Sequence, residues 1–158
     1  MKRGTIVFAA VVFGTAGLAT DSAAQEFQTG GYATYIQTGA TTTALADGGS
    51  RVDAIIAGYV LTDDPSSPIH LVAQDCASTN LVDADGNLAR SAGYCAGRDA
   101  DGDMFWIWFW NGADGGKWGV INGTGKFEGM TGGGTSVPQA GDPDGRFAIR
   151  WEGTFNMQ

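Results

Sequence analysis

Along the chain, runs of β-branched, aliphatic and aromatic residues alternate with short segments rich in Asp, Gly, Asn and Pro. Apolar runs bounded by such turn residues are typical of β-strands. Seven runs fit this description: Tyr32–Gln37, Val52–Leu61, Ile69–Ser78, Leu88–Gly97, Met104–Trp110, Lys117–Asn122 and Phe147–Asn156. After the first 24 residues, no apolar positions keep a helical spacing without a glycine interruption. The pattern therefore predicts an all-β protein of roughly eight short strands, either a sandwich or a closed barrel.

Three segments between these runs combine an Asp-Gly pair with further acidic residues: Asp83–Asn87, Asp99–Asp103 and Asp142–Gly145. An Asp-Gly pair favours a tight hairpin turn. The first two segments also resemble calcium loops, but neither has the glycine and the glutamate that an EF-hand needs at its sixth and twelfth positions. We interpret them as hairpin turns, with a weak adventitious cation site as the alternative, and predict no metal site.

A glycine-rich segment spans residues 123–134 and begins with Gly-Thr-Gly-Lys. The residues around this lysine lack the glycine spacing and the following Ser or Thr of a phosphate-binding P-loop. The core-type residues Phe127 and Met130 interrupt the glycines. They favour strand bends of the kind that close a small barrel, and a flexible loop is the alternative.

The N-terminus has the pattern of a secretory signal peptide. A cationic start, Met1–Gly4, precedes a largely apolar run over residues 5–19, and Ser22 and Ala24 are small residues suited to a cleavage site. A membrane anchor or a buried helix is the alternative, but a spanning helix needs ~20 apolar residues. We predict a signal peptide over residues 1–24 and a barrel domain over residues 25–158. The expected location is secreted or periplasmic, without a stable membrane anchor.

The charge balance is acidic, with nine Lys+Arg against seventeen Asp+Glu and a formal net charge of −8. Without residues 1–24 it becomes seven against sixteen, or −9. The remaining basic residues form no cluster. Because nucleic-acid binding depends on such clusters, we predict no nucleic-acid partner.

Two cysteines, Cys76 and Cys95, give an even count. In an oxidising compartment an even count favours a disulfide, here between two strands joined by the Asp85-Gly86 turn. A metal pair or a redox-active thiol is the alternative. The spacing is not Cys-x-x-Cys, however, and the single histidine, His70, leaves a metal too few soft ligands.

Candidate catalytic groups are few. The chain has no Gly-x-Ser-x-Gly, and His70 would have to serve any triad. Glu128 and Glu152 are the better acid–base candidates. Strand alternation places Arg150 and Glu152 on the face opposite the apolar residues of the last run. That polar face either meets solvent or lines a lumen, where it would orient a ligand.

The run Met104–Trp110 is apolar on both faces. Phe105, Ile107 and Phe109 share one face, whereas Met104, Trp106, Trp108 and Trp110 share the other. Three tryptophans exposed on a soluble monomer would be unusual. We therefore expect Trp106, Trp108, Trp110 and Met104 either to bind an apolar ligand or to form a subunit interface beside the core.

The segment Gly116–Phe127, GKWGVINGTGKF, resembles the G-x-W-x-x-x-x-GTGK-[FY] segment of the allene oxide cyclase and dirigent barrel superfamily. Gly93-Tyr94-Cys95 and Asp99–Asp103 resemble further features of its secreted bacterial members. This resemblance covers roughly residues 70–156. It implies a closed eight-stranded antiparallel barrel with a central cavity, often trimeric in the plant relatives. The plant cyclases use a lumen glutamate, for which Glu152 is only the nearest candidate by strand position.

These observations lead to three functional hypotheses. The first is an exported barrel that binds a small apolar or aromatic molecule, or assembles as a homo-oligomer through its aromatic surface, without a cofactor. The second is a cyclase or isomerase that confines an apolar substrate, with Glu152 and Arg150 in polar roles. The third is a purely structural protein of the cell envelope.

Overall fold

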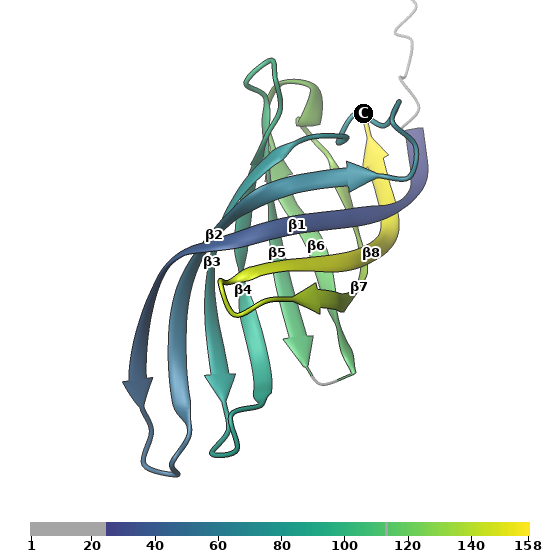
Figure 1. Ribbon diagram of the computed structural model, residues 1–158. Helices are drawn as coiled ribbons and strands as arrows, with labels where there is room; N and C mark the ends of the chain where they lie inside the picture. The colour runs from purple at the N-terminus through teal and green to yellow at the C-terminus, as the bar shows by residue number, and fades with distance from the viewer. Residues whose placement is uncertain (1–24, 113) are drawn as a thin grey trace, which may run out of the picture.

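The computed structural model describes residues 25–112 and 114–158, so the predicted signal peptide lies outside the described residues. Eight antiparallel strands follow one another around a closed barrel, and β8 pairs with β1 (Figure 1). The strands are β1 (Gln25–Ala44), β2 (Ser50–Thr62), β3 (Ala73–Val82), β4 (Leu88–Arg98), β5 (Met104–Gly112), β6 (Gly115–Gly123), β7 (Thr131–Gly141) and β8 (Arg146–Met157). The predicted closed eight-stranded barrel is therefore confirmed. No helix in these two ranges is long and apolar enough to cross a membrane.

Strand β1 is 20 residues long and holds the barrel closed. Residues 25–36 of β1 pair with β8, and residues 31–44 pair with β2. The pairing with β2 has a register shift between Gln37 and Gly39. In Figure 1 the lower ends of β1 to β4 extend past the β7–β8 hairpin. One end of the barrel is therefore walled mainly by strands other than β7 and β8.

Inward-facing residues of all but the glycine-rich strand β7 build an apolar core, as the two-residue period of a strand requires. Its buried members are Ala33, Tyr35, Ile56, Val60, Ile69, Val72, Cys76, Cys95, Phe105, Trp118, Phe127, Met130, Trp151 and Phe155. Four of them come from connections rather than strands. Ile69 and Val72 lie in the β2–β3 loop, and Phe127 and Met130 lie in the β6–β7 connection. These four side chains close one end of the barrel, which we call the closed end.

The three acidic segments are hairpin turns of one design. In each, the carboxylate of the first Asp accepts backbone N–H bonds from inside the turn or from the start of the next strand: Asp83 from Asp85 and Asn87, Asp99 from Asp101 and Asp103, and Asp142 from Arg146. A glycine with positive φ follows, between 82° and 92° at Gly86, Gly102 and Gly145. The turn interpretation is confirmed. No group of three potential metal-ligating side chains occurs among the residues that the structure describes.

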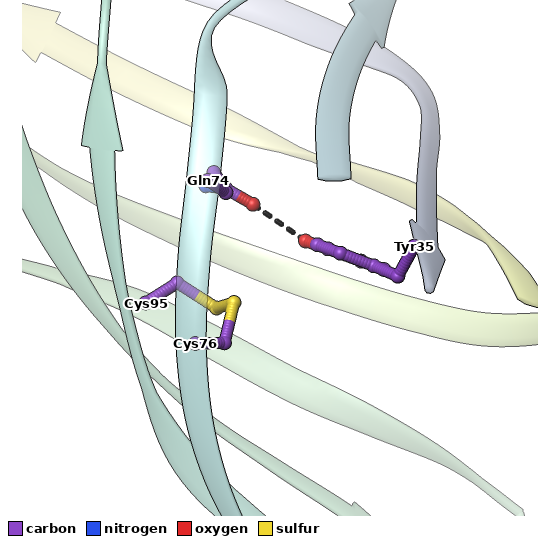
Figure 2. The surroundings of a disulfide bond; sticks show 4 residues. All are labelled: Tyr35, Gln74, Cys76 and Cys95. Atoms are coloured by element: carbon purple, nitrogen blue, oxygen red, sulfur yellow. Dashed lines mark hydrogen bonds between the residues drawn. A yellow bond between two sulfur atoms is a disulfide. The ribbon is translucent and has the colours of Figure 1, made fainter. Parts of the chain in front are cut away.

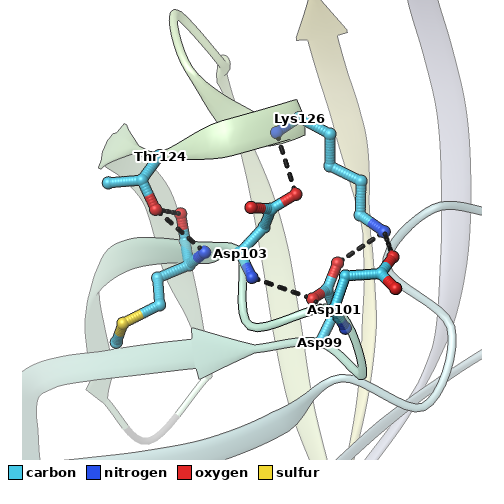
Figure 3. A network of polar contacts seen from close by, with 6 residues as sticks. Asp99, Asp101, Asp103, Thr124 and Lys126 are labelled. Carbon is cyan, nitrogen blue, oxygen red and sulfur yellow. Dashed lines mark hydrogen bonds and ion pairs between the residues drawn. The ribbon is translucent and has the colours of Figure 1, made fainter.

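The Gly-Thr-Gly-Lys segment makes contacts that stabilise the closed end. It leads into a short 3-10 helix, η1 (Gly125–Phe127). Lys126 Nζ lies 2.5 Å from Asp99 Oδ2 and 3.2 Å from Asp101 Oδ2, while its backbone N–H donates to Asp103 (Figure 3). The β4–β5 turn is thereby tied to η1, which carries the buried Phe127.

The cysteine prediction is also confirmed. Cys76 of β3 and Cys95 of β4 are directly opposite in register and form a disulfide (Figure 2). Neither cysteine in the described part of the chain is free, so the metal pair and the redox-active thiol do not apply.

Three segments differ from the sequence-based expectation, the first being β1, which extends well beyond the predicted run Tyr32–Gln37. Residues 69–72 do not belong to β3 but form the loop that closes the barrel. Strand β7 overlaps the glycine-rich segment at its first four residues and has no counterpart among the seven predicted runs. Its glycines allow close approach, since a Cβ on Gly134 would lie 1.9 Å from the carbonyl oxygen of Glu152. The glycines therefore serve strand packing, as the bend interpretation expected.

Candidate functional site in the barrel lumen

The barrel encloses a cavity of about 370 Å³. This volume lies at the lower end of the range typical of small-molecule sites, roughly 300–1,000 Å³. Opposite the closed end, its lining includes the exposed residues Gln37, Leu88 and Pro138. The cavity is therefore reached from this side, which we call the open end.

Aromatic rings form much of the cavity wall. Trp118 packs edge-to-face against Trp151 with ring centroids 5.9 Å apart, and it lies 5.0 Å from Phe155. Nearer the open end, Tyr35 of β1 packs against Phe147 of β8 with ring centroids 5.3 Å apart. Such contacts hold large rings in fixed orientations and favour a rigid, preformed pocket.

The two cavity tryptophans differ in their hydrogen bonding. The indole N–H of Trp118 donates to the carbonyl oxygen of Thr135 at 3.2 Å. The indole N–H of Trp151 is buried and has no protein acceptor. A buried donor without a partner is uncommon in folded proteins and costs stability.

Neutral polar side chains also line the cavity: Tyr35, Gln37, Gln74, Ser78, Asn80, Ser91, Asn111 and Ser136. The Tyr35 hydroxyl donates to Gln74 Oε1 at 2.5 Å, and both residues are buried (Figure 2). Burial raises the pKa of Tyr35 far above its ordinary value, so the phenol keeps its proton. Nearer the open end, Ser136 donates to Asn111 Oδ1 at 3.0 Å.

None of the described residues that line this cavity is Asp, Glu, Lys, Arg or His. An ion without a partner is strongly disfavoured in an apolar site, because it loses its hydration. The cavity therefore suits an uncharged molecule. Its described walls also carry no side chain that exchanges a proton near neutral pH, as general acid–base chemistry needs.

Arg150 and Glu152 lie outside the lumen. The residues of β8 that line the cavity include Phe147, Ile149, Trp151 and Phe155, which alternate with these two. Arg150 donates to both carboxylate oxygens of Asp63, at 2.7 and 2.6 Å, and its Nη2 lies 3.5 Å from Glu152 Oε1. The bonds from Arg150 lower the pKa of Asp63 and raise that of Arg150 itself. This arrangement joins the β2–β3 loop to β8.

The tryptophans of β5 also face outward. Trp108 and Trp110 are 41% and 39% exposed, and Arg90 stacks over Trp110. Trp106 and Met104 are half-buried on the same outer face. None of the four lines the cavity, whereas Phe105, Ile107 and Phe109 do.

The pairing of β5 with β4 contains a signal that sequence reasoning missed. Phe105, Ile107 and Phe109 lie opposite Gly97, Cys95 and Gly93. Large rings facing small residues fit inside a narrow barrel, and a Cβ on Gly97 would lie 2.8 Å from the Phe105 ring. Cys95 lies on the inner face of β4, so the β5 residues on the same side of the sheet also face the lumen.

The remaining candidates, His70 and Glu128, do not line the cavity. His70 Nδ1 accepts the backbone N–H of Thr62 at 3.2 Å, which fixes the loop that carries Ile69. Glu128 is exposed just after η1. The contact of His70 with Thr62 is therefore a structural one.

No family model matches the chain, and no curated protein sequence matches it. Among solved structures it resembles the pterocarpan synthase dirigent protein GePTS1, with a TM-score of 0.54 and 14% identity over 93% of this chain and 97% of that one. It also resembles the pterocarpan synthase dirigent protein PsPTS1, with a TM-score of 0.52 and 15% identity over 84% and 96%. The predicted dirigent-like barrel fold is therefore confirmed. At this level of identity the likeness concerns the fold.

Proposed function

We propose that this protein is an exported barrel that binds a small, uncharged, largely apolar molecule in its lumen. The observation that carries the proposal is the 370 Å³ cavity, which is walled by aromatic and aliphatic side chains and lacks charged residues in the described lining. The disulfide and the predicted signal peptide support export to the periplasm or beyond the cell. The similar dirigent barrels are named as pterocarpan synthases, which supports a role for such a lumen with small organic molecules.

Binding explains the lumen better than acid–base catalysis does. The carboxylate and guanidinium proposed for a cyclase or isomerase, Glu152 and Arg150, lie on the outer face. A catalytic role in this lumen would have to come from confinement and orientation of the substrate.

Two matched fluorescent probes test this proposal. N-phenyl-1-naphthylamine is neutral, and 1-anilinonaphthalene-8-sulfonate is the same ring system with an anionic group. The neutral probe should bind with one-to-one saturation, and the anion at least tenfold more weakly, because the described cavity walls offer no cation. Equal binding of the two probes would contradict an uncharged ligand class.

The location of the probe is tested with two variants of neighbouring residues. Ile107→Trp adds bulk inside the lumen and should abolish binding of the neutral probe. Trp108→Ala removes a ring from the outer face and should leave binding unchanged. The opposite result would move the site to the outer surface, and circular dichroism should show that both variants fold.

Assembly of identical subunits through the outer aromatic surface is a second candidate function. Tyr94 is 63% exposed and lies directly opposite Trp108 across β4 and β5, with Trp110 on the same face. Exposed apolar patches of this kind mark interaction surfaces. Sedimentation of the wild type as an oligomer and of Tyr94→Ala/Trp108→Ala as a monomer would support it, and a monomeric wild type would exclude it.

A further inference from the structure

We propose that the Tyr35–Gln74 pair is the polar anchor of the lumen, and that it selects a ligand with a hydrogen-bond-accepting oxygen, such as a ketone. This inference rests on the proposed binding function and adds the chemical class of the ligand. It also assigns two positioning residues that come from strands β1 and β3.

The two side chains are placed inside the cavity wall. Tyr35 is 8% and Gln74 3% exposed, and both line the cavity. Figure 2 shows them pointing toward one another beside the disulfide, with the Tyr35 hydroxyl at Gln74 Oε1. The hydroxyl thus holds the carboxamide of Gln74 in one orientation.

The pair leaves hydrogen-bonding capacity unused. A glutamine amide has two N–H donors as well as its carbonyl acceptor. Tyr35 occupies the acceptor, and no protein acceptor for Gln74 Nε2 is found among the described residues. Gln74 Nε2 is not one of the fully buried atoms that lack a partner, so it is accessible from the cavity, where a ligand oxygen can accept its hydrogen bond.

The surroundings of the pair restrict what else it could hold. Ala33, Ile56 and Cys95 are apolar neighbours in the lining, and the phenol remains protonated because burial raises its pKa. A neutral donor in an apolar wall discriminates between a carbonyl compound and a hydrocarbon of the same shape. An anion would gain one hydrogen bond but lose its hydration.

The experiment compares 2-acetylnaphthalene with 2-isopropenylnaphthalene, in which a CH₂ group replaces the carbonyl oxygen. Binding to the protein is followed by quenching of tryptophan fluorescence. The wild type should bind the ketone about five- to tenfold more tightly than the alkene, as expected for one net hydrogen bond. In Tyr35→Phe/Gln74→Leu this ratio should fall to about one, while affinity for the alkene is kept.

The double variant removes both polar partners and so leaves no unpaired group from the pair in the core. Gln28→Leu is the matched control, because Gln28 bonds Thr154 on the exposed outer surface; it should keep the wild-type ratio. Equal affinities in the wild type, or a ratio that survives in the double variant, would overturn the anchor while lumen binding stands. Failure of both 2-acetylnaphthalene and 2-isopropenylnaphthalene to bind the wild type would overturn the proposed function itself.

Discussion

Trp118 and Trp151 show how one hydrogen bond distinguishes two otherwise similar residues. Both rings are buried, they pack against each other edge-to-face, and both line the lumen. Only Trp118 has an acceptor for its N–H, the carbonyl of Thr135. Their shapes contribute alike to the core, but their polar atoms do not.

Substituting each tryptophan by phenylalanine separates these contributions. The loss of ring volume is the same, so the difference reports on the N–H group. We expect Trp118→Phe to lower the free energy of unfolding by about 1–2 kcal/mol more than Trp151→Phe, because it loses a satisfied bond and the other change removes an unpaired donor. Urea denaturation measures both values. Equal losses would show that Trp151 has a partner in solution.

Two glycines, Gly86 and Gly58, are required for different physical reasons. Gly86 has φ of 87° and open space around its missing Cβ, whereas a Cβ on Gly58 would lie 1.9 Å from the Thr34 carbonyl oxygen. Gly86→Ala should cost about 1–2 kcal/mol for its left-handed backbone. Gly58→Ala should cost about 3 kcal/mol or more, because two strands must separate. Thermal unfolding of the two variants compares them directly; a cheaper Gly58→Ala would contradict the strand spacing.

At the scale of elements, the turns were predictable and one strand was not. Asp-Gly pairs act locally, so Asp83–Asn87 and Asp99–Asp103 could be identified as turns from sequence alone. Strand β7 contains Gly132–Gly134 and Pro138, which give neither alternation nor β-branched enrichment. Its pairing comes from β6 and β8 rather than from its own propensity.

The site was predictable only in part, for a related reason. Both faces of β5 are apolar, so alternation alone could not decide which one faces the lumen. The sequence alone is compatible with a polar face of β8 toward either solvent or the lumen, and the structure places this face outside. Tyr35 and Gln74 lie 39 positions apart, and only the closed barrel brings them together.

The link between β8 and the β2–β3 loop gives the fold a dependence on pH. Hydrogen bonds from Arg150 depress the pKa of Asp63 below its usual 3.8 in the folded state. The resulting stabilisation is present above the unfolded pKa and is lost as the pH falls through the folded one. We expect a constant melting temperature from neutral pH to about pH 5 and a decline below about pH 4.

Asp63→Asn tests this assignment, because it removes the titrating carboxylate and keeps the side-chain shape. The variant should melt lower than the wild type at pH 7, and the gap should narrow toward pH 3. Asp53 and Asp99 also have lowered pKa values, so part of the acid decline should persist. Parallel melting curves at all pH values would contradict the role of Asp63.

At the scale of the whole molecule, the disulfide joins β3 and β4 across 19 positions. Its cross-link restricts the unfolded chain, so Cys76→Ala/Cys95→Ala should lose about 3 kcal/mol of stability while the barrel still forms. Urea denaturation with and without a reductant checks this. The reductant should destabilise the wild type and leave the double variant unchanged; loss of β-structure in the variant at low urea would mean that closure itself needs the cross-link.

Ile69, Val72, Phe127 and Met130 close one end of the barrel, so the ligand proposed above would enter and leave through the open end. Microscopic reversibility then ties the two directions of traffic together. A side chain that narrows the open end without contacting the bound ligand lowers the association rate and the dissociation rate by the same factor. For the ligand proposed above, bulkier side chains at the open end beyond Leu88, which itself lines the cavity, would therefore lengthen the residence time and leave the dissociation constant unchanged.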